Sequence, residues 1–152
     1  MNFKPWLVTA SAVLGVAVAT AAPQYFAHQF PPNAKPLPFS DAVLVGDTLY
    51  VGGHIGIDPK TGQAPADTAV EARLLLDSVQ ATLKSAGLGM DDLVSVTVYC
   101  TDLSLYDAFN SAYASYFHGK YPARALVGVA SLIRGGHFEI QAVAVKAGAA
   151  HR

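Results

Sequence analysis

Two charged residues stand among apolar neighbours near the C-terminal end of the 152-residue chain. The stretch from Tyr121 to Val145 reads YPARALVGVASLIRGGHFEIQAVAV, and it predicts two strands joined by a Gly-Gly turn. Arg124 lies at the start of the first strand and Glu139 lies inside the second. A cation and a carboxylate in such surroundings are costly unless they are paired, hydrogen-bonded or used in chemistry. These two residues are therefore the first candidates for a site.

Paired as a hairpin, the two strands can place Arg124 and Glu139 on one face and in one small pocket, although the register stays open. The guanidinium of arginine binds a carboxylate through two hydrogen bonds. A glutamate, directly or through a water, can act as general base for water attack on an imine carbon and return a proton to the departing nitrogen. From the residues alone, a plain buried salt bridge remains an equally open interpretation.

Motifs for other kinds of chemistry are absent from the sequence. It contains no GxxxxGK[ST] loop, no dinucleotide-binding fingerprint, no GxSxG and no HExxH, and its only cysteine is Cys100. We therefore expect no cofactor and no metal. The formal net charge of −1 predicts no nucleic-acid partner, because such proteins carry a basic surface.

Short strands and two helices must position the candidate residues. Alternating apolar residues predict strands at 41–45 and 48–52 about the Gly46-Asp47 turn, a loop from Gly53 onward, and a strand over LVSVTVYCT at 93–101. The first helix is expected from Thr68, capped by Thr68 and Glu71, to Gly87.

A second helix is expected from Ser104, capped with Asp107, to Gly119, and its aromatic stripe indicates core packing. The elements predict an α+β domain in which two helices pack on one face of a mixed β-sheet. The other face is too apolar for water, so we expect a second copy of the chain to cover it and pockets to lie at the seams of a homo-oligomer.

The first 22 residues have the pattern of a secretory signal peptide: a lysine, an apolar run and small residues before a cleavage site. Retention as a membrane anchor is the alternative, but the run is short and weakly apolar for a spanning helix. Residues 1–22 are thus predicted as a signal peptide, 23–37 as a proline-rich leader and 38–148 as the domain. The expected location is the periplasm or the exterior, with no stable membrane insertion after cleavage.

Three stretches together resemble the RidA (YjgF) family of reactive intermediate deaminases. They are PFSDAVLVGDTLYVGGHIGIDPKTGQ, EARLLLDSVQATLKSAGLGMDDLVSVTVYCTDLSLYDAFNSAYASYF and YPARALVGVASLIRGGHFEIQAVAV, which cover about Pro38 to Lys146. The resemblance implies a chorismate-mutase-like fold and a homotrimer with three inter-subunit clefts. It also implies hydrolysis of 2-imino or 2-enamino acids to 2-oxo acids and ammonia without a cofactor.

Site residues carry over from the resemblance position by position. Arg124 matches the arginine that clamps the substrate carboxylate, and Glu139 matches the glutamate that positions the water. Asn110 and Gly53 match positions that border the cleft, although a helix contact for Asn110 and a turn for Gly53 are alternatives from the residues themselves.

Three other positions depart from the pattern common in the family and make the predicted cleft more apolar. Phe39 stands where many members have tyrosine, Leu126 replaces cysteine or threonine, and His54 replaces glutamine. By this resemblance Phe39 and Leu126 are expected to shape the pocket and contact the substrate. The leading hypothesis is an exported deaminase acting on a small carboxylate substrate. The alternative is a non-catalytic small-molecule-binding or chaperone-like trimer, and ribonuclease activity, also proposed for the family, ranks last because the chain offers no basic groove.

Overall fold

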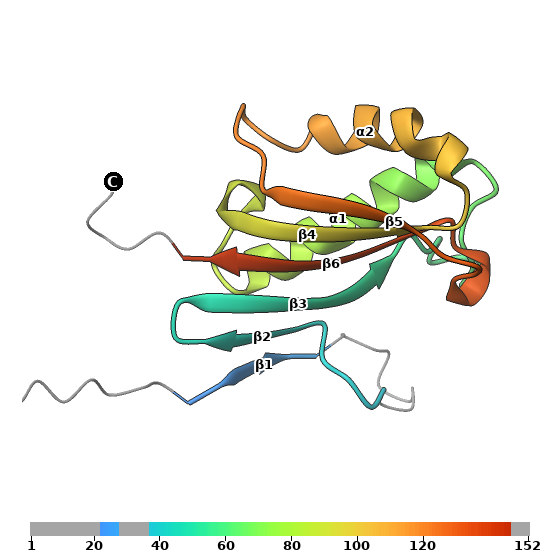
Figure 1. Cartoon of the computed structure of the whole chain (residues 1–152). Helices are drawn as coiled ribbons and strands as arrows, with labels where there is room; N and C mark the ends of the chain where they lie inside the picture. The colour runs from blue at the N-terminus through green and yellow to red at the C-terminus, as the bar shows by residue number, and fades with distance from the viewer. Residues whose placement is uncertain (1–21, 28–36, 147–152) are drawn as a thin grey trace, which may run out of the picture.

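The computed structural model describes residues 22–27 and 37–146, which form one mixed sheet with two helices packed on it (Figure 1). The six strands are β1 (Gln24–Phe26), β2 (Ala42–Val45), β3 (Thr48–Ile55), β4 (Leu93–Cys100), β5 (Ala123–Gly128) and β6 (Phe138–Val145). The helices are α1 (Thr68–Ser85) and α2 (Tyr106–Ala114), with short 3-10 turns η1 (Met90–Asp92), η2 (Leu103–Leu105) and η3 (Ile133–Gly135). The predicted α+β class is confirmed.

The strand order in the sheet is β1-β2-β3-β6-β4-β5, so β4 lies between β5 and β6. The β4–β5 pair is parallel, whereas β6 runs antiparallel to both β3 and β4. The predicted hairpin of two paired strands between Tyr121 and Val145 is therefore wrong. Both predicted strands exist, as β5 and β6, but they lie on either side of β4. The connection between them contains η3 and is longer than the two-residue turn that joins paired strands of a tight hairpin.

One face of the sheet carries the core. Alternate residues of β4 and β6 are buried against α1 and α2, and the ring of Phe109 on α2 lies 4.8 Å from that of Phe138 on β6. The aromatic stripe of the second helix thus serves packing, as predicted, with Phe109, Tyr113 and Phe117 all buried. Cys100 is a buried free thiol on the same face, and burial raises its pKa.

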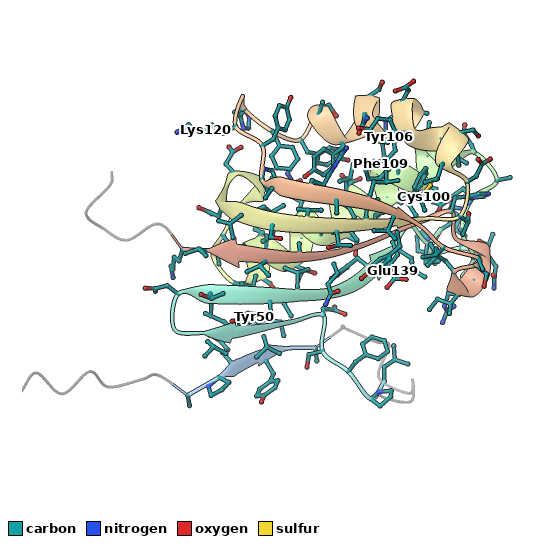
Figure 2. The ribbon with its side chains drawn as sticks, in the orientation of Figure 1. Tyr50, Cys100, Tyr106, Phe109, Lys120 and Glu139 are labelled. Carbon is teal, nitrogen blue, oxygen red and sulfur yellow. The ribbon has the colours of Figure 1, made fainter. Side chains whose placement is uncertain are left out.

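No helix within the described residues lies over the opposite face, and α1 passes behind the sheet in the view of Figure 1. Tyr50 on β3, labelled in Figure 2, is 53% exposed there. It is joined on this face by further exposed apolar residues that alternate with the core positions, namely Val45, Val127 and Val145. The apolar character expected of the second face is present, and the copy expected to cover it remains a prediction.

Two strand boundaries differ from the predicted ones. Strand β3 continues through Gly52 and Gly53 to Ile55, with a shift of register between Val51 and His54, where a loop was expected. Glycines weaken a strand, but they also accommodate a β-bulge, and Gly52 and Gly53 lie at this shift of register. Within the predicted leader, Gln24–Phe26 forms β1 and pairs antiparallel with β2.

The helix caps also differ from the predicted ones. Asp67 caps α1, because its side chain accepts hydrogen bonds from the backbone N–H groups of Ala69 and Val70. Asp102 caps η2, the turn before α2, and accepts a hydrogen bond from the N–H of Ser104. The first residue before α2 is Leu105, whose side chain makes no capping bond, so the expected cap by Ser104 and Asp107 is not observed. The expected capping residue Glu71 is buried instead against β6, so its carboxylate serves a tertiary contact.

Residues 1–21 of the predicted signal peptide lie outside the described residues. Among the residues that are described, no helix has the length and apolarity needed to span a membrane. The boundaries predicted for the signal peptide, leader and domain stay predictions.

Candidate functional site

Arg124 occupies the second position of β5 and points toward the helices. Its parallel-strand partner is Val96, a buried residue on the core face, which places both side chains on that side of the sheet. The Nη2 of Arg124 donates a hydrogen bond of 2.6 Å to the Oδ1 of Asn110 on α2. The guanidinium carbon also lies 4.7 Å from the centre of the Tyr113 ring and 5.9 Å from that of Tyr106. Asn110 and the aromatic rings therefore hold the guanidinium in one orientation.

A cavity of about 450 Å³ adjoins this guanidinium. Its walls are Asn110, Tyr113, Ala114, Tyr121, Pro122 and Arg124. Arg124 forms no ion pair with a carboxylate within the described ranges, so its remaining N–H groups are available for an anion. The cavity thus has the chemistry of a carboxylate-binding site.

Tyr113 is a further part of this cavity that the sequence did not single out. Its hydroxyl is buried and has no hydrogen-bond partner among the described residues, and burial raises the pKa of Tyr113 to about 12. The hydroxyl therefore stays protonated at neutral pH. The only signal in the sequence was the aromatic stripe, which does not distinguish a ring in the core from a ring that also supports an arginine.

Glu139 lies on the other face of the sheet. It is paired across the ladders with Tyr99 on β4 and Ile55 on β3, and it alternates with the buried core residues Phe138 and Ile140. Partial burial raises its pKa, which is a property of carboxylates that act as bases near neutral pH. Figure 2 shows Glu139 beside β6, apart from Tyr106 on α2.

Gly53 lies directly against the Glu139 carboxylate. A Cβ atom placed on Gly53 would collide with the Oε1 atom of Glu139 and would lie 3.2 Å from its carboxyl carbon. The absence of a side chain at position 53 therefore makes room for the carboxylate. Gly53 was predicted to border the cleft, and here it is the close neighbour of the candidate base.

A second cavity, of about 460 Å³, adjoins Gly53. Phe39, predicted as a substrate contact, lies in its wall, and so does His54. His54 is buried, and its Nδ1 lies 2.9 Å from the hydroxyl of Ser78. This histidine is thus part of the cavity wall.

Arg124 and Glu139 do not share a pocket within one chain. They lie on opposite faces of the sheet, on strands separated by β4, and the described residues contain no ion pair between them. The hypothesis that they share a face of a hairpin is wrong, and the alternative of a plain salt bridge is wrong with it. Each chain instead carries two separate groups of candidate residues, which we call half-sites: Arg124 with Asn110, and Glu139 with Gly53.

Leu126 lies on the same face as Arg124, two residues along β5. It is half-buried and packs against the hydrophobic core. It does not contribute to the wall of either cavity described above. Its predicted contact with substrate stays a prediction.

A buried carboxylate anchors the start of β6, two residues before Glu139. Glu71 on α1 is fully buried and accepts hydrogen bonds from the backbone N–H groups of His137, at 2.6 Å, and Phe138, at 2.9 Å. Its second oxygen lies 2.6 Å from Nδ1 of the His137 ring. Glu71 therefore fixes the strand that presents Glu139, and His137 serves this contact.

Among the described residues, no group of three or more His, Cys, Asp or Glu side chains could hold a metal ion. The two half-sites offer a guanidinium, an amide, a carboxylate and backbone groups. This set can bind a carboxylate and activate a water molecule.

A family model described as endoribonuclease L-PSP matches residues 31–146. Relatives in sequence include the 2-iminobutanoate/2-iminopropanoate deaminase of Capra hircus, 41% identical over 72% of this chain and 80% of its own length. The protein of the same name from Escherichia coli is 38% identical over 72% of this chain and 88% of its own length.

Solved structures are similar over nearly their whole length. The E. coli YjgF gene product has a TM-score of 0.73 and 36% identity, covering 82% of this chain and 99% of its own. RidA from an Antarctic Psychrobacter has a TM-score of 0.69 and 34% identity, covering 74% of this chain and 91% of its own. The similarity extends over both half-sites, since it spans the segments that hold Phe39 to Glu139.

Proposed function

The chain belongs to the endoribonuclease L-PSP family, which is the RidA (YjgF) family, and we propose that it hydrolyses 2-imino or 2-enamino acids to 2-oxo acids and ammonia. Relatives that carry the name 2-iminobutanoate/2-iminopropanoate deaminase support deaminase chemistry. The observation that carries the proposal is the pair of half-sites, one suited to a carboxylate and one suited to activating water.

We place the complete site between two copies of the chain, where the Arg124 half-site of one copy meets the Glu139 half-site of the next. The location of the two residues on opposite faces of the sheet supports this arrangement, because a single chain does not bring them together. The uncovered apolar face around Tyr50 and Val127 supports the association of copies. Three copies forming a closed ring with three equivalent clefts is the assembly we propose.

In the cleft, Arg124 binds the substrate carboxylate while Asn110 keeps the guanidinium oriented. Glu139, as a carboxylate, removes a proton from a water molecule whose oxygen attacks the imine carbon. The carbon–nitrogen double bond becomes a single bond, and Glu139 returns the proton to nitrogen. Glu139 then takes the proton of the new hydroxyl group and passes it to the amino group. Ammonia leaves as the carbonyl of the 2-oxo acid forms, so no redox change is required.

Phe39 favours the alternative of a trimer that binds small molecules without turning them over. Its side chain lies in the wall of the Gly53 cavity and has no hydroxyl to offer a hydrogen bond to substrate or water. Export, which the N-terminal residues predict, would also remove the protein from cytosolic sources of imines. The two functions differ in turnover and share the carboxylate site.

The test is the release of ammonia and 2-oxo acid from a 2-imino acid generated in the assay by an amino-acid oxidase. We expect the wild-type chain to accelerate release, Glu139→Gln to abolish the acceleration and Arg124→Ala to lower kcat/KM by roughly 100-fold or more, because a bidentate charged contact is lost. Wild type and both variants releasing product at the uncatalysed rate would reject the deaminase. A ligand-dependent rise in melting temperature without turnover would then favour the binding function.

A further inference from the structure

The cavity beside Gly53 has mostly apolar walls. Large apolar residues line it from four separate segments of the chain, namely Leu37, Phe39, Ile55, Ile57, Leu74 and Ile133. Pockets of this size, about 460 Å³ here, bury the greater part of a small organic ligand. The ligand group that matches such walls is apolar.

Two polar side chains in the same walls, His54 and Arg134, are hydrogen-bonded within the protein. His54 is hydrogen-bonded to the hydroxyl of Ser78 and lies 3.4 Å from the carbonyl oxygen of Asp41. Arg134 donates a hydrogen bond of 2.9 Å to the carbonyl oxygen of Gly62. His54 and Arg134 thus each have a hydrogen-bond partner in the protein, and most of the remaining wall is apolar.

Apolar residues of the cavity are strongly exposed in the single chain. Leu37 is 41% exposed, Phe39 is 59% exposed and Ile133 is 68% exposed. Exposed apolar side chains gathered at one hollow mark a place where an apolar group binds. Gly53 joins this cavity to the Glu139 carboxylate, since it lines the first and contacts the second.

We propose that the cavity binds the substituent on C2 of the substrate and selects branched aliphatic or aromatic side chains over methyl. The inference rests on the proposed function, because it takes Glu139 as the group next to the reacting carbon. With the carboxylate at Arg124 of another copy and C2 beside Glu139, the side chain enters the cavity at Gly53. The names of the relatives specify propanoate and butanoate, with methyl and ethyl side chains, and this cavity holds considerably larger groups.

The first test is calorimetric binding of four 2-oxo acids to the purified chain: pyruvate, 2-oxobutanoate, 4-methyl-2-oxopentanoate and phenylpyruvate. We expect Kd to fall by about fourfold for each CH₂ group that enters the cavity, because burial of one such group contributes about 0.8 kcal/mol. The corresponding imines should follow the same order in kcat/KM. Equal or weaker binding of the larger acids, or no binding of any of them, would overturn the inference.

The second test fills the cavity. Leu74→Phe adds volume to the wall formed by α1 and should lower the ratio of the 4-methyl-2-oxopentanoate affinity to the pyruvate affinity by about tenfold. Leu103→Phe is the matched control, because Leu103 is exposed and lies outside the walls of both cavities. Melting curves check that both variants are folded. A ratio that Leu74→Phe leaves unchanged would overturn the inference.

The two proposals fail in different ways. Graded binding of the four acids without turnover of any imine would reject the deaminase and keep the side-chain cavity. Turnover of all imines, with affinities that do not depend on side-chain size, would keep the deaminase and reject the side-chain cavity.

Discussion

The guanidinium of Arg124 is suited to binding an anion because its neighbours orient it without neutralising its charge. Asn110 accepts a hydrogen bond at 2.6 Å, and the ring of Tyr113 lies 4.7 Å from the guanidinium carbon. Neither partner carries a negative charge at neutral pH, so the positive charge stays available to a ligand. Arg124 and Glu139 could be chosen from the sequence because charge in apolar strands is costly, and Asn110 and Gly53 could be chosen from the family resemblance. Tyr113 could not, since an aromatic stripe predicts a core equally well.

We expect Asn110→Ala to raise KM by about tenfold with a smaller effect on kcat. The hydrogen bond to the charged guanidinium is worth about 1.5 to 3 kcal/mol, and its loss lets the arginine leave the orientation that binds carboxylate. Steady-state kinetics on one imine separates the two constants. A fall in kcat with an unchanged KM would show that Asn110 acts at the reacting carbon instead.

The raised pKa of Glu139 predicts how both kcat/KM and the stability of the fold change with pH. The base must be ionised, so kcat/KM should fall as pH decreases through a pKa that lies above the ordinary value of 4.5. The stability of the fold depends on pH in the opposite direction. A carboxyl whose pKa is raised in the folded state stabilises the fold at low pH. That contribution is lost as pH rises from 4.5 to the pKa of Glu139 in the folded state.

Glu139→Gln should therefore melt at a higher temperature than wild type at pH 7, and the difference should disappear below pH 4.5. Calorimetric melting curves across this pH range provide the measurement. A variant that is less stable than wild type at pH 7 would show that the Glu139 carboxylate is stabilised by the fold.

At the level of secondary-structure elements, β6 is the strand that must be held in place. Glu71 on α1 accepts two backbone hydrogen bonds at its start, and Gly53 in β3 leaves room for the Glu139 carboxylate beside it. The pairing of β6 with β3 and β4 was not predictable from the sequence. The reason is local, because η3 turns the chain through Arg134 at φ 55° and Gly135 at φ 70°. A positive φ is uncommon for an arginine, so the sequence gives no sign of this turn.

The helix α1, in contrast, could be predicted almost to its ends. Its apolar spacing and Gly87, which adopts φ 77°, set its length and stop. The capping roles of Thr68 and Glu71 were misjudged, because a glutamate three residues after a threonine has the spacing of a capping box whether or not it serves as one. Glu71 is buried against β6 in the folded chain and therefore does not cap the helix.

Glu71→Ala should destabilise the chain by about 3 kcal/mol, because two buried backbone N–H groups lose their acceptor. Urea unfolding monitored by circular dichroism measures the change. Gln80→Ala, at an exposed position of the same helix, should shift stability by less than about 0.5 kcal/mol. Equal effects of the two substitutions would contradict the anchoring role.

Gly53→Ala should lower kcat by about 100-fold, because the new Cβ displaces the Glu139 carboxylate and small displacements of a reacting group are costly. The control is Gly89→Ala, where an added Cβ has its nearest neighbour 4.0 Å away. Activity of Gly53→Ala close to wild type would show that Glu139 tolerates another position.

At the scale of the whole molecule, the exposed apolar face and the separated half-sites have one explanation in common. In the assembly that we propose, association of copies through the face around Tyr50 would bury the apolar residues and bring Arg124 and Glu139 of different chains together. The sequence could predict the need for a cover, since alternating apolar residues mark both faces of the strands. It could not predict which residues meet across the seam, because that depends on the register of β4, β5 and β6.

We expect Tyr50→Glu to dissociate the oligomer, since a charge would be buried in an apolar interface. Val70→Glu, at an exposed position on α1, should leave the assembly intact. Light scattering after size-exclusion chromatography gives the mass of each species. A Tyr50→Glu chain with the mass and activity of wild type would place the interface elsewhere.

The most direct measurement of the central claim is complementation between inactive subunits. Arg124→Ala and Glu139→Gln chains, unfolded together in equal amounts and refolded, form mixed oligomers. If each cleft takes Arg124 from one copy and Glu139 from another, about one quarter of the clefts contain both native residues, and activity should return to about a quarter of the wild-type value. If both residues acted within one chain, no cleft would be complete, and the mixture would stay as inactive as its components.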